Sequence, residues 1–353
     1  MRIGIPSETK TLEGRVALVP FACGDLVKAG HEVFIQSGAG LKSGFGDADF
    51  SKVGVTVVPD AATLFEKAEL VVKVKEPIAG DLAHLRADHR LFCYLHLAAE
   101  PELTTALTDI GLTAVAFETV EDSDGSLPLL APMSIIAGRI ATQVGTHLLH
   151  QPEGGRGVLL GGLGGAERGH VVVLGAGAAG GHAAGLAAAG GARVTVFDKR
   201  PDRLEAMMAT GVNISALYPY SDAVAEAVAH ADLVIGAVLV TGARAPHVLT
   251  RPMIEAMPSG SVVIDISVDQ GGCFETTQPT TYQDPTYVVD GVTHFAVTNM
   301  PGAVPRTASQ ALSAAILPYV LKMAEPSWEH HEALHKGVNV RSGQVIHPAL
   351  LAA

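Results

Sequence analysis

The sequence is poor in cysteine and in clustered positive charge. Its three cysteines, Cys23, Cys93 and Cys273, are odd in number and form no C-x-x-C pair. This pattern argues against a disulfide framework and against a zinc site, and nothing else in the residues calls for a catalytic metal. The net charge is −12, and no run of Lys or Arg offsets it. Because such a chain repels nucleic acid and anionic lipid, we expect neither as a partner.

The sequence also lacks a convincing membrane-spanning run. Residues 171–192 carry no charge, but glycines and His182 interrupt them, and their pattern is that of a strand followed by a helix. The opening segment, MRIGIPSETK, has no apolar region of the kind found in secretion signals. We therefore expect a cytoplasmic protein with no membrane partner.

What the sequence does contain is a repeated alternation of apolar, β-rich runs with helical stretches. Its 353 residues, 48% of them hydrophobic, exceed the roughly 250 to 300 residues at which a single core stops growing, so we expect two domains. The first set of runs is 1–6, 32–36, 70–75, 90–97 and 113–120, and the second set is 171–175, 194–198, 231–238, 261–267 and 293–297. Each set predicts a parallel, doubly wound sheet with crossover helices.

Two long helices are expected to join the domains. Residues 133–150 and 306–324 have apolar residues at helical spacing, each beginning beside a proline. The tail from Trp328 shows no strand pattern, and we expect it to return to the first domain. The predicted fold class is α/β, with two doubly wound Rossmann-like domains joined by long helices and a cleft between them. The expected bounds are 1–130 plus 305–353 for the first domain and 131–304 for the second.

A glycine-rich turn at residues 175–180 predicts a dinucleotide site in the second domain. Gly175, Gly177 and Gly180 form G-x-G-x-x-G directly after the strand run VVVL and before the stretch AAGLAAA. The first glycine allows a tight turn, the second lets the backbone approach a pyrophosphate, and the third lets the helix pack closely on the sheet. A plain glycine-rich turn is the alternative, but Asp198 at the end of the next strand run favours the nucleotide interpretation.

The acidic residue Asp198 favours NAD over NADP as the cofactor. Its carboxylate is expected to accept hydrogen bonds from the adenosine ribose hydroxyls and to repel a 2′-phosphate. The basic neighbours Lys199, Arg200 and Arg203 weaken this inference, because they could neutralise a phosphate. Solvated surface charge is the more ordinary role for Lys199 and Arg200, so NAD remains the expected cofactor.

Three polar residues of the first domain fall at strand ends. Lys75 closes the run LVVKVK, His96 closes RLFCYLHL, and Arg15 follows the first strand in EGRVALVP. Ligands of doubly wound sheets bind outside the carboxyl ends of the strands, so these residues suggest a site for a small anionic substrate. A guanidinium fork fits a carboxylate particularly well. On pattern alone, a surface Lys, a buried structural His and a surface Arg remain open as alternatives.

Polar residues of the second domain occupy similar positions. Asp269 follows the run SVVIDIS and precedes Gln-Gly-Gly, while Asn299 and Met300 follow the run FAVT. Both segments therefore fall at strand ends, where a ligand site is expected. The alternative for Asp269 is a turn or helix-capping role, which is common for Asp before glycines.

Taken together, the motifs resemble the alanine dehydrogenase family, which includes the NAD-binding subunits of transhydrogenases. The similar segments include GIPSETKTLEGRVAL, KVKEP, YLHLAA, GGRGVLLGG, VLGAGAAG, DLVIGAVLVTGARAP, DQGGCFETT and NMPGAVPRTASQAL, and they cover nearly the whole chain. The resemblance implies an NAD-dependent enzyme that interconverts L-alanine with pyruvate and ammonium by hydride transfer and iminium hydrolysis. It also implies a homo-oligomer, most often a hexamer.

The resemblance further implies a role for individual residues. Arg15 and Lys75 match the positions that grip the substrate carboxylate and keto oxygen, so the first domain is expected to bind substrate. His96 matches the general acid/base, and Asp269 matches an aspartate that helps to activate water or ammonia. The implied cofactor contacts are Ser134 at the pyrophosphate, Asp198 at the ribose, Asn299 and Met300 at the nicotinamide, and the glycine turn with Arg203 and Leu239.

Three alternatives to this function remain. In a transhydrogenase-like NAD(H)-binding subunit a glutamate is usual before Q-G-G, so Asp269 and His96 favour the dehydrogenase. A saccharopine dehydrogenase matches DQGGCFETT poorly, and a silent dinucleotide sensor would not need the intact set of polar residues at strand ends. The stretch LYPYSD at 217–222 departs from the common family wording, which leaves the adenine contacts undefined.

Overall fold

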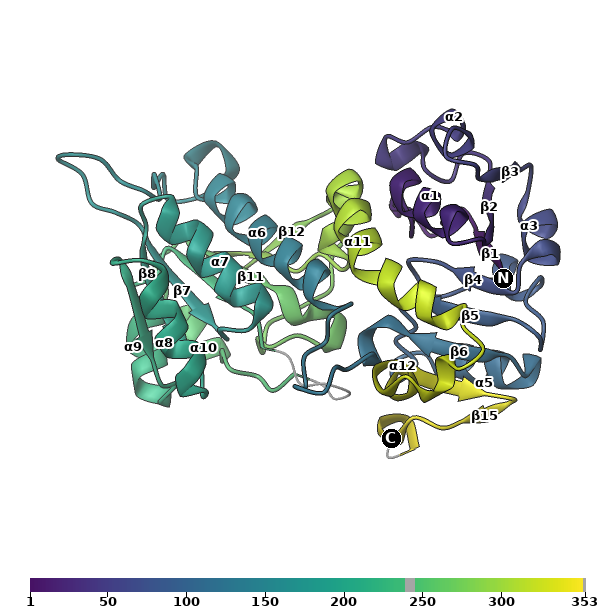
Figure 1. The fold of residues 1–353 in the computed structure, drawn as a ribbon. Coiled ribbons are helices and arrows are strands. Elements are labelled where there is room, and N and C mark those ends of the chain that lie inside the picture. The colour runs from purple at the N-terminus through teal and green to yellow at the C-terminus, as the bar shows by residue number, and fades with distance from the viewer. Residues whose placement is uncertain (239–244, 352–353) are drawn as a thin grey trace. The chain divides into compact units, whose positions relative to one another are not determined.

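The computed structural model describes residues 1–238 and 245–351 (Figure 1). These residues divide into two compact units, which we describe separately. Unit 1 comprises Met1–Met133 and Gly302–Ala353, and unit 2 comprises Ser134–Pro301.

Among the described residues, unit 1 is built on an 8-stranded sheet. From edge to edge, its strands are β15 (Gln344–Val345), β14 (Val338–Arg341), β6 (Thr113–Ala116), β5 (Arg90–Cys93), β4 (Leu70–Val72), β1 (Arg2–Ile5), β2 (Glu32–Gln36) and β3 (Thr56–Val58). Strands β1 to β6 pair in parallel, whereas β14 and β15 are antiparallel. The order β3-β2-β1-β4-β5-β6 is that of a doubly wound sheet, as the sequence predicts.

The helices of unit 1 mostly connect successive strands. They are α1 (Pro20–Lys28), α2 (Asp47–Ser51), α3 (Ala61–Lys67), α4 (Ala79–Leu82), α5 (Pro101–Ile110), α11 (Pro305–Met323), α12 (Glu332–Gly337) and α13 (Pro348–Leu351). Proline occupies the first turn of α1, α5 and α11, where its missing N–H costs nothing. Helix α5 ends at Gly111, whose φ of 82° is the left-handed conformation that glycine adopts readily.

The sequence-based expectation for the tail is partly confirmed and partly wrong. The tail does return to the first domain, because β14 pairs with β6. It nevertheless contains strands β14 and β15, although no strand pattern was visible. Asn339 interrupts the apolar pattern of β14, yet it is buried, and its amide donates to the Thr119 hydroxyl and to the Gly337 carbonyl. An irregular register between Val338 and Val340 hides the alternation further.

Unit 2 repeats the same sheet order. Among the described residues its 7-stranded sheet runs β12 (Thr286–Val289), β13 (Val292–Phe295), β11 (Val262–Asp265), β10 (Leu233–Gly236), β7 (His170–Leu174), β8 (Arg193–Phe197) and β9 (Ile214–Leu217). All pairs are parallel except that of β12 with β13. Its helices are α7 (Ala178–Ala189), α8 (Pro201–Thr210), α9 (Ser221–Ala229), α10 (Arg251–Glu255) and most of α6 (Ala131–Leu148). The predicted fold class is therefore confirmed in both units.

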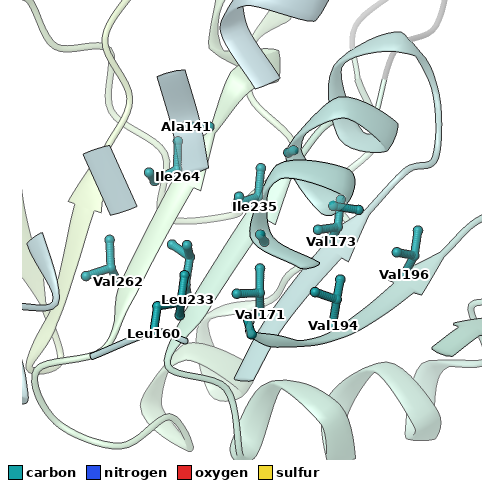
Figure 2. Close-up of a cluster of buried hydrophobic side chains, with 14 of the residues drawn as sticks. Ala141, Leu160, Val171, Val173, Val194, Val196, Leu233, Ile235, Val262 and Ile264 are labelled. Atoms are coloured by element: carbon teal, nitrogen blue, oxygen red, sulfur yellow. The ribbon is translucent and has the colours of Figure 1, made fainter. Parts of the chain in front are cut away.

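Apolar side chains cover both faces of the central strands in unit 2. Alternate residues point to one face, and Figure 2 shows Val171, Val173 and Ile235 among the cluster formed there. The intervening residues, such as Val172 and Val234, belong to a cluster on the opposite face. Burial on both faces explains why these strands are continuous apolar runs.

Helices α6 and α7 pack closely and in parallel. A side chain at Gly138 of α6 would overlap the Ala179 carbonyl of α7. One turn later, the Thr142 hydroxyl donates to the Ala183 carbonyl at 3.0 Å. Because the spacing is four residues on both helices, they run side by side in the same direction.

Two predicted strand ends are wrong. Strand β4 stops at Val72 and β5 stops at Cys93, so Lys75 and His96 lie in the loops after these strands rather than closing them. Hydrogen bonding between the two chain segments continues briefly beyond β4 and β5 into the loops, where the Tyr94 amide donates to the Val74 carbonyl at 3.0 Å. The two loops therefore remain neighbours at the carboxyl edge of the sheet.

Candidate functional site

In each unit the candidate residues follow strands on either side of the point where the strand order reverses. This point lies between β1 and β4 in unit 1 and between β7 and β10 in unit 2. Ligands of doubly wound sheets bind in the crevice outside the carboxyl ends of such strands. The loops after β1, β4 and β5 carry Arg15, Lys75 and His96, and those after β7, β8, β11 and β13 carry the predicted cofactor residues.

The glycine turn has the geometry expected of a nucleotide-binding turn. Gly175 has a φ of 101°, and a side chain there would lie 2.5 Å from the Ala237 carbonyl oxygen. A side chain at Gly180 would overlap the carbonyl of Gly175, so helix α7 can pack this closely only with glycine there. At Gly177, by contrast, the nearest atom to an added Cβ is the Arg203 Nη1 at 3.6 Å. The backbone at Gly177, at the start of α7, is therefore open to an approaching anion.

The acidic residue Asp198 lies directly after β8 and is buried. Its Oδ2 accepts from the Ala176 amide at 2.7 Å, and its Oδ1 accepts from the Arg200 amide at 2.8 Å. The Arg203 guanidinium lies 3.5 Å from the same carboxylate. Asp198 thus ties the glycine turn to the end of β8, and Arg203 stands beside both.

The remaining predicted cofactor residues of unit 2 are placed as follows. Ser134 is half-buried in the first turn of α6. Asn299 has a φ of 60° and precedes the short helix Met300–Ala303, and Met300 is buried with its carbonyl accepting from the Tyr282 hydroxyl at 2.8 Å. Leu239 lies outside the described residues.

Asp269 is exposed in a short helical turn, Ile266–Gln270, which follows β11. A second carboxylate, that of Asp265, holds this turn in place by hydrogen bonds. It accepts from the amides of Ser267 at 2.9 Å and Cys273 at 2.8 Å, and from the Thr277 hydroxyl. The segment that carries Asp269 is thereby held at both ends by one buried side chain.

In unit 1, Arg15 is buried and paired with Glu13. Glu13 binds the Arg15 Nε at 2.7 Å and Nη2 at 2.5 Å. The Arg15 Nη1 lies 3.2 Å from the Met133 sulfur. Burial disfavours the charged form of Arg15, but the hydrogen bonds and charge of Glu13 outweigh it and raise the pKa of the guanidinium. Arg15 therefore remains positively charged, and part of its guanidinium group is already hydrogen-bonded to Glu13.

The loop that carries Lys75 is held by a buried ionic network. The Glu8 carboxylate accepts from the Val74 amide at 2.7 Å and lies 3.7 Å from the Lys73 ammonium, which also contacts Asp81 at 2.7 Å. Burial raises the pKa of Glu8, while the Lys73 charge acts against this rise. Lys75 itself is half-buried.

His96 has a backbone conformation that L-residues rarely adopt. Its φ is 51°, a region that costs a non-glycine residue about 1 to 3 kcal/mol. Glu118 holds this conformation by accepting from the amides of His96 at 2.6 Å and Leu95 at 3.1 Å. The His96 ring stacks on Tyr94, whose hydroxyl donates to the Leu129 carbonyl at 2.6 Å. Burial raises the pKa of Tyr94, so it remains a neutral donor.

Four carboxylates that support the site were missed by the sequence reasoning. Each accepts hydrogen bonds from a loop that carries a predicted site residue, and they are Glu8, Glu13, Glu118 and Asp265. Glu13 is two residues from Arg15 and could have been suspected. Glu118 and Glu8 act across 22 and 66 residues of sequence, and Asp265 reaches Cys273 across 8, distances at which no local pattern reveals the contact.

The described residues contain neither a metal-binding cluster nor a membrane-spanning helix. No group of three or more His, Cys, Asp or Glu side chains among them is arranged to hold a metal ion. No helix among them is long and apolar enough to cross a membrane.

Family models match both halves of the chain. The model described as alanine dehydrogenase/PNT, N-terminal domain, matches residues 4–137, and the model of the C-terminal domain matches residues 141–348. The chain belongs to the alanine dehydrogenase/PNT family. The resemblance seen in the sequence motifs is thereby confirmed.

Two relatives and one solved structure with similar sequences are named alanine dehydrogenase. Alanine dehydrogenase from Halomonas elongata is 48% identical over 100% of this chain and 96% of the relative. The one from Mycobacterium tuberculosis is 47% identical over 98% and 95%. A solved L-alanine dehydrogenase structure superposes with a TM-score of 0.95 at 49% identity, covering 100% of this chain and 98% of that one.

Transhydrogenase is a more distant neighbour. The solved structure of transhydrogenase from Sinorhizobium meliloti has a TM-score of 0.86 at 26% identity, covering 99% of this chain and 100% of that one. The identity to the alanine dehydrogenases is thus nearly twice as high at similar coverage.

Proposed function

We propose that this chain catalyses the reversible NAD-dependent oxidative deamination of L-alanine to pyruvate and ammonium. The observation that carries the proposal is the identity of 47 to 48% to named alanine dehydrogenases over nearly the full length of both chains. As a member of this family the chain is an NAD-dependent oxidoreductase. The residue roles below are part of the proposal.

The residues of unit 2 fit a nicotinamide dinucleotide. The open backbone at Gly177 and the N-terminus of α7 suit the pyrophosphate, and the Asp198 carboxylate suits the ribose hydroxyls. Ser134 lies one turn before Gly138, so the parallel packing of α6 on α7 carries it toward the level of the glycine turn. Asn299 and Met300 follow β13, on the other half of the sheet, where the nicotinamide half is expected.

The residues of unit 1 suit a small carboxylate. We assign the substrate carboxylate to Arg15 and Lys75. The Arg15 Nη1 faces the Met133 sulfur, a weak acceptor that a carboxylate oxygen would replace favourably. Because Glu13 fixes the rest of the fork, little side-chain entropy is lost when substrate binds.

The reaction follows from these placements. NAD, when bound, supplies the acceptor for the hydride that leaves the alanine Cα, and the substrate, whose ammonium group has first lost a proton to solvent, becomes an iminium ion. Water adds to the iminium carbon, and His96 takes the proton released by that water and returns it to the amine. The C–N bond then breaks, and the carbinol hydroxyl gives its proton to the departing ammonia as it becomes the keto group. Asp269 orients the water or ammonia. The products are pyruvate and ammonium, and histidine is the residue most often used for such proton transfers near neutral pH.

The proposal is tested by following NADH absorbance in the purified protein with pyruvate and ammonium. We expect NADH consumption that needs both substrates together and that yields L-alanine. Omission of ammonium is the matched control, because a 2-hydroxy-acid dehydrogenase would still consume NADH with pyruvate alone. Equal rates with and without ammonium, or no consumption at all, would overturn the proposal.

A transhydrogenase-like role is the second candidate, supported by the TM-score of 0.86 to the S. meliloti structure. Its reaction moves a hydride between two nicotinamide nucleotides and needs neither pyruvate nor ammonium. Hydride exchange between NADH and an NAD analogue in the absence of both substrates would support it. Asp269 and His96, which only the dehydrogenase reaction uses, favour the first candidate.

We also propose a homohexamer located in the cytoplasm. The hexamer is proposed by analogy with the family and is tested by the molar mass from light scattering. The cytoplasmic location fits the cysteines, which are all free and buried, as expected in a reducing compartment. A molar mass other than six times 36.4 kDa would exclude the hexamer.

A further inference from the structure

Two buried serines hold the backbone on both sides of Arg15. Ser43 and Ser309 are each fully buried, and their hydroxyl oxygens lie 2.8 Å apart. The Val16 amide donates to the Ser309 hydroxyl at 2.9 Å, and the Ser43 hydroxyl donates to the Gly14 carbonyl at 2.8 Å. The residue before Arg15 and the residue after it are therefore both tied to this serine pair.

The serine pair forms one continuous chain of hydrogen bonds. Each hydroxyl carries a single proton. The Ser43 oxygen lies nearer to the Gly14 carbonyl, at 2.8 Å, than to the Pro305 carbonyl, at 3.3 Å, so we assign the Ser43 proton to Gly14. The Ser309 proton then bridges the two hydroxyls, and the chain runs from the Val16 amide through both serines to the Gly14 carbonyl. Because each bond polarises the next, removal of either hydroxyl weakens the whole chain.

The two serines come from parts of unit 1 that are distant from Arg15 in the sequence. Ser43 ends the short helical turn Leu41–Ser43, and Ser309 lies in the second turn of α11. The Glu13 bonds to the guanidinium, by contrast, come from the same segment as Arg15. They set the guanidinium relative to its own backbone, whereas the serine pair sets that backbone relative to α11.

A shift of this backbone would carry the guanidinium away from the substrate carboxylate. Hydrogen bonds weaken steeply as their angle departs from linearity, and the two-pronged pairing of a guanidinium with a carboxylate is especially dependent on geometry. We propose that Ser43 and Ser309 are positioning residues that set Arg15 for binding the substrate carboxylate. The inference rests on the proposed function, in which Arg15 binds that carboxylate.

Ser313 provides a matched control one turn further along α11. It is also fully buried, and its hydroxyl accepts from the Val19 amide at 3.0 Å. Ser309→Ala and Ser313→Ala therefore each remove a buried serine hydroxyl that accepts from a backbone amide. Val19 lies four residues beyond Arg15, directly before α1, so only Ser309→Ala acts beside Arg15.

The test measures alanine formation from pyruvate, ammonium and NADH by the full-length protein. We expect Ser309→Ala and Ser43→Ala each to raise the KM for pyruvate by about 3- to 10-fold, the equivalent of about 0.6 to 1.4 kcal/mol, with kcat nearly unchanged. Ser313→Ala should leave this KM as it is. The double variant Ser43→Ala/Ser309→Ala should raise it by less than the product of the two single effects, because both changes interrupt one chain.

Two further measurements separate positioning from a general loss of structure. The melting temperatures of Ser309→Ala and Ser313→Ala should fall by similar amounts, because each loses a buried hydrogen bond of the same kind. The affinity for NADH should be unchanged in every variant, because the predicted dinucleotide residues belong to unit 2.

The serine assignment would be overturned by an unchanged pyruvate KM in Ser309→Ala, or by an equal rise in Ser309→Ala and Ser313→Ala. A parallel loss of NADH affinity would also overturn it, and independent effects in the double variant would contradict a single chain. The wild-type protein is measured first. If it forms no alanine, the proposed function is overturned and the serine assignment falls with it.

Discussion

At the scale of single residues, the candidate site consists of cations and acids whose loops are held by carboxylates, of which Asp265 is buried and Glu118 half-buried. Glu118 holds the amide of His96, and Asp265 holds the turn of Asp269. Hydrogen bonds to a charged group are worth about 1.5 to 3 kcal/mol, enough to maintain the strained φ of His96. The supporting carboxylates should therefore matter for turnover because they hold the loops that carry the proposed site residues.

Replacing His96 should affect the chemistry far more than cofactor binding. His96→Ala removes the proposed acid/base, so kcat should fall by roughly 10²- to 10⁴-fold. The affinity for NADH should be unchanged, because the dinucleotide residues all belong to unit 2. Steady-state kinetics and an NADH titration measure the two effects. Near-normal turnover would remove His96 from the reaction.

Replacing Glu118 should act through His96. Glu118→Ala removes the acceptor of the His96 and Leu95 amides. Because hydrogen bonds to a charged group are worth about 1.5 to 3 kcal/mol and these position the imidazole, their loss should lower kcat roughly 10- to 100-fold. Glu118→Gln keeps one acceptor oxygen and should retain more activity. Since a general loss of folding would also weaken NADH binding, an unchanged NADH affinity with reduced kcat identifies the positioning role. Full activity of Glu118→Ala would contradict it.

The residue types of the site could be anticipated from the sequence, but their partners could not. Lys75, His96 and Asp269 stand out because each follows an apolar run and thus a strand end. The sequence suggests an open guanidinium group at Arg15, whereas in the structure Arg15 forms an ion pair with Glu13. The contact of Glu8 with Val74 depends on two loops folding together across 66 residues, which no local pattern encodes.

At the scale of elements, the strands buried on both faces were the easiest to predict. The run His170–Leu174 is wholly buried and reads as continuous apolar sequence. Short or partly exposed strands were missed, such as Thr56–Val58 and Thr286–Val289, whose exposed positions break the pattern. Strand ends were overestimated because apolar residues continue into the loops, as Val74 and Leu95 do.

Helix α7 offers a matched pair of glycine substitutions. Gly180→Ala places a Cβ against the Gly175 carbonyl, so it should lower the melting temperature and weaken NADH binding. Gly185→Ala, one and a half turns later, meets only the Thr210 methyl group at 3.5 Å, an ordinary contact. It should stabilise the helix by about 0.5 to 1 kcal/mol. Thermal unfolding of both variants checks this contrast, and equal effects would contradict the tight turn at Gly175.

At the scale of the whole molecule, the two units share one strand order but use it differently. In unit 1 the loops at the carboxyl ends of the central strands carry Arg15, Lys75 and His96, whereas in unit 2 they carry glycines and acids. The same fold thus offers a cationic edge in one unit and a nucleotide-binding edge in the other. This division supports the proposed split between substrate and cofactor.

Buried imidazoles should make the stability of the folded chain depend on pH. Burial lowers the pKa of His89, His170 and His294 from the ordinary value of 6.5. As the pH falls from about 7.5 through 6.5, the unfolded chain takes up protons that the folded chain does not. The free energy of unfolding should therefore decrease over this window. The buried Glu8, whose pKa is raised, acts in the opposite direction but is a single group.

Denaturant unfolding at pH 7.5 and at pH 5.5 measures this dependence. His294→Gln should reduce the difference between the two conditions, because it removes one of the buried imidazoles. His247→Gln, which changes an exposed histidine in the same unit, should leave the difference as it is. A wild-type protein that is equally stable at both pH values would contradict the prediction.

The central claim is that a hydride passes from the nicotinamide to the substrate carbon with ammonium as co-substrate. It is tested most directly with NADH that carries deuterium at both C4 positions of the nicotinamide, mixed with protein, pyruvate and ammonium. The account predicts L-alanine with deuterium on Cα, formed in equal amount to the NAD produced. Unlabelled alanine, or NADH oxidation without alanine, would contradict it.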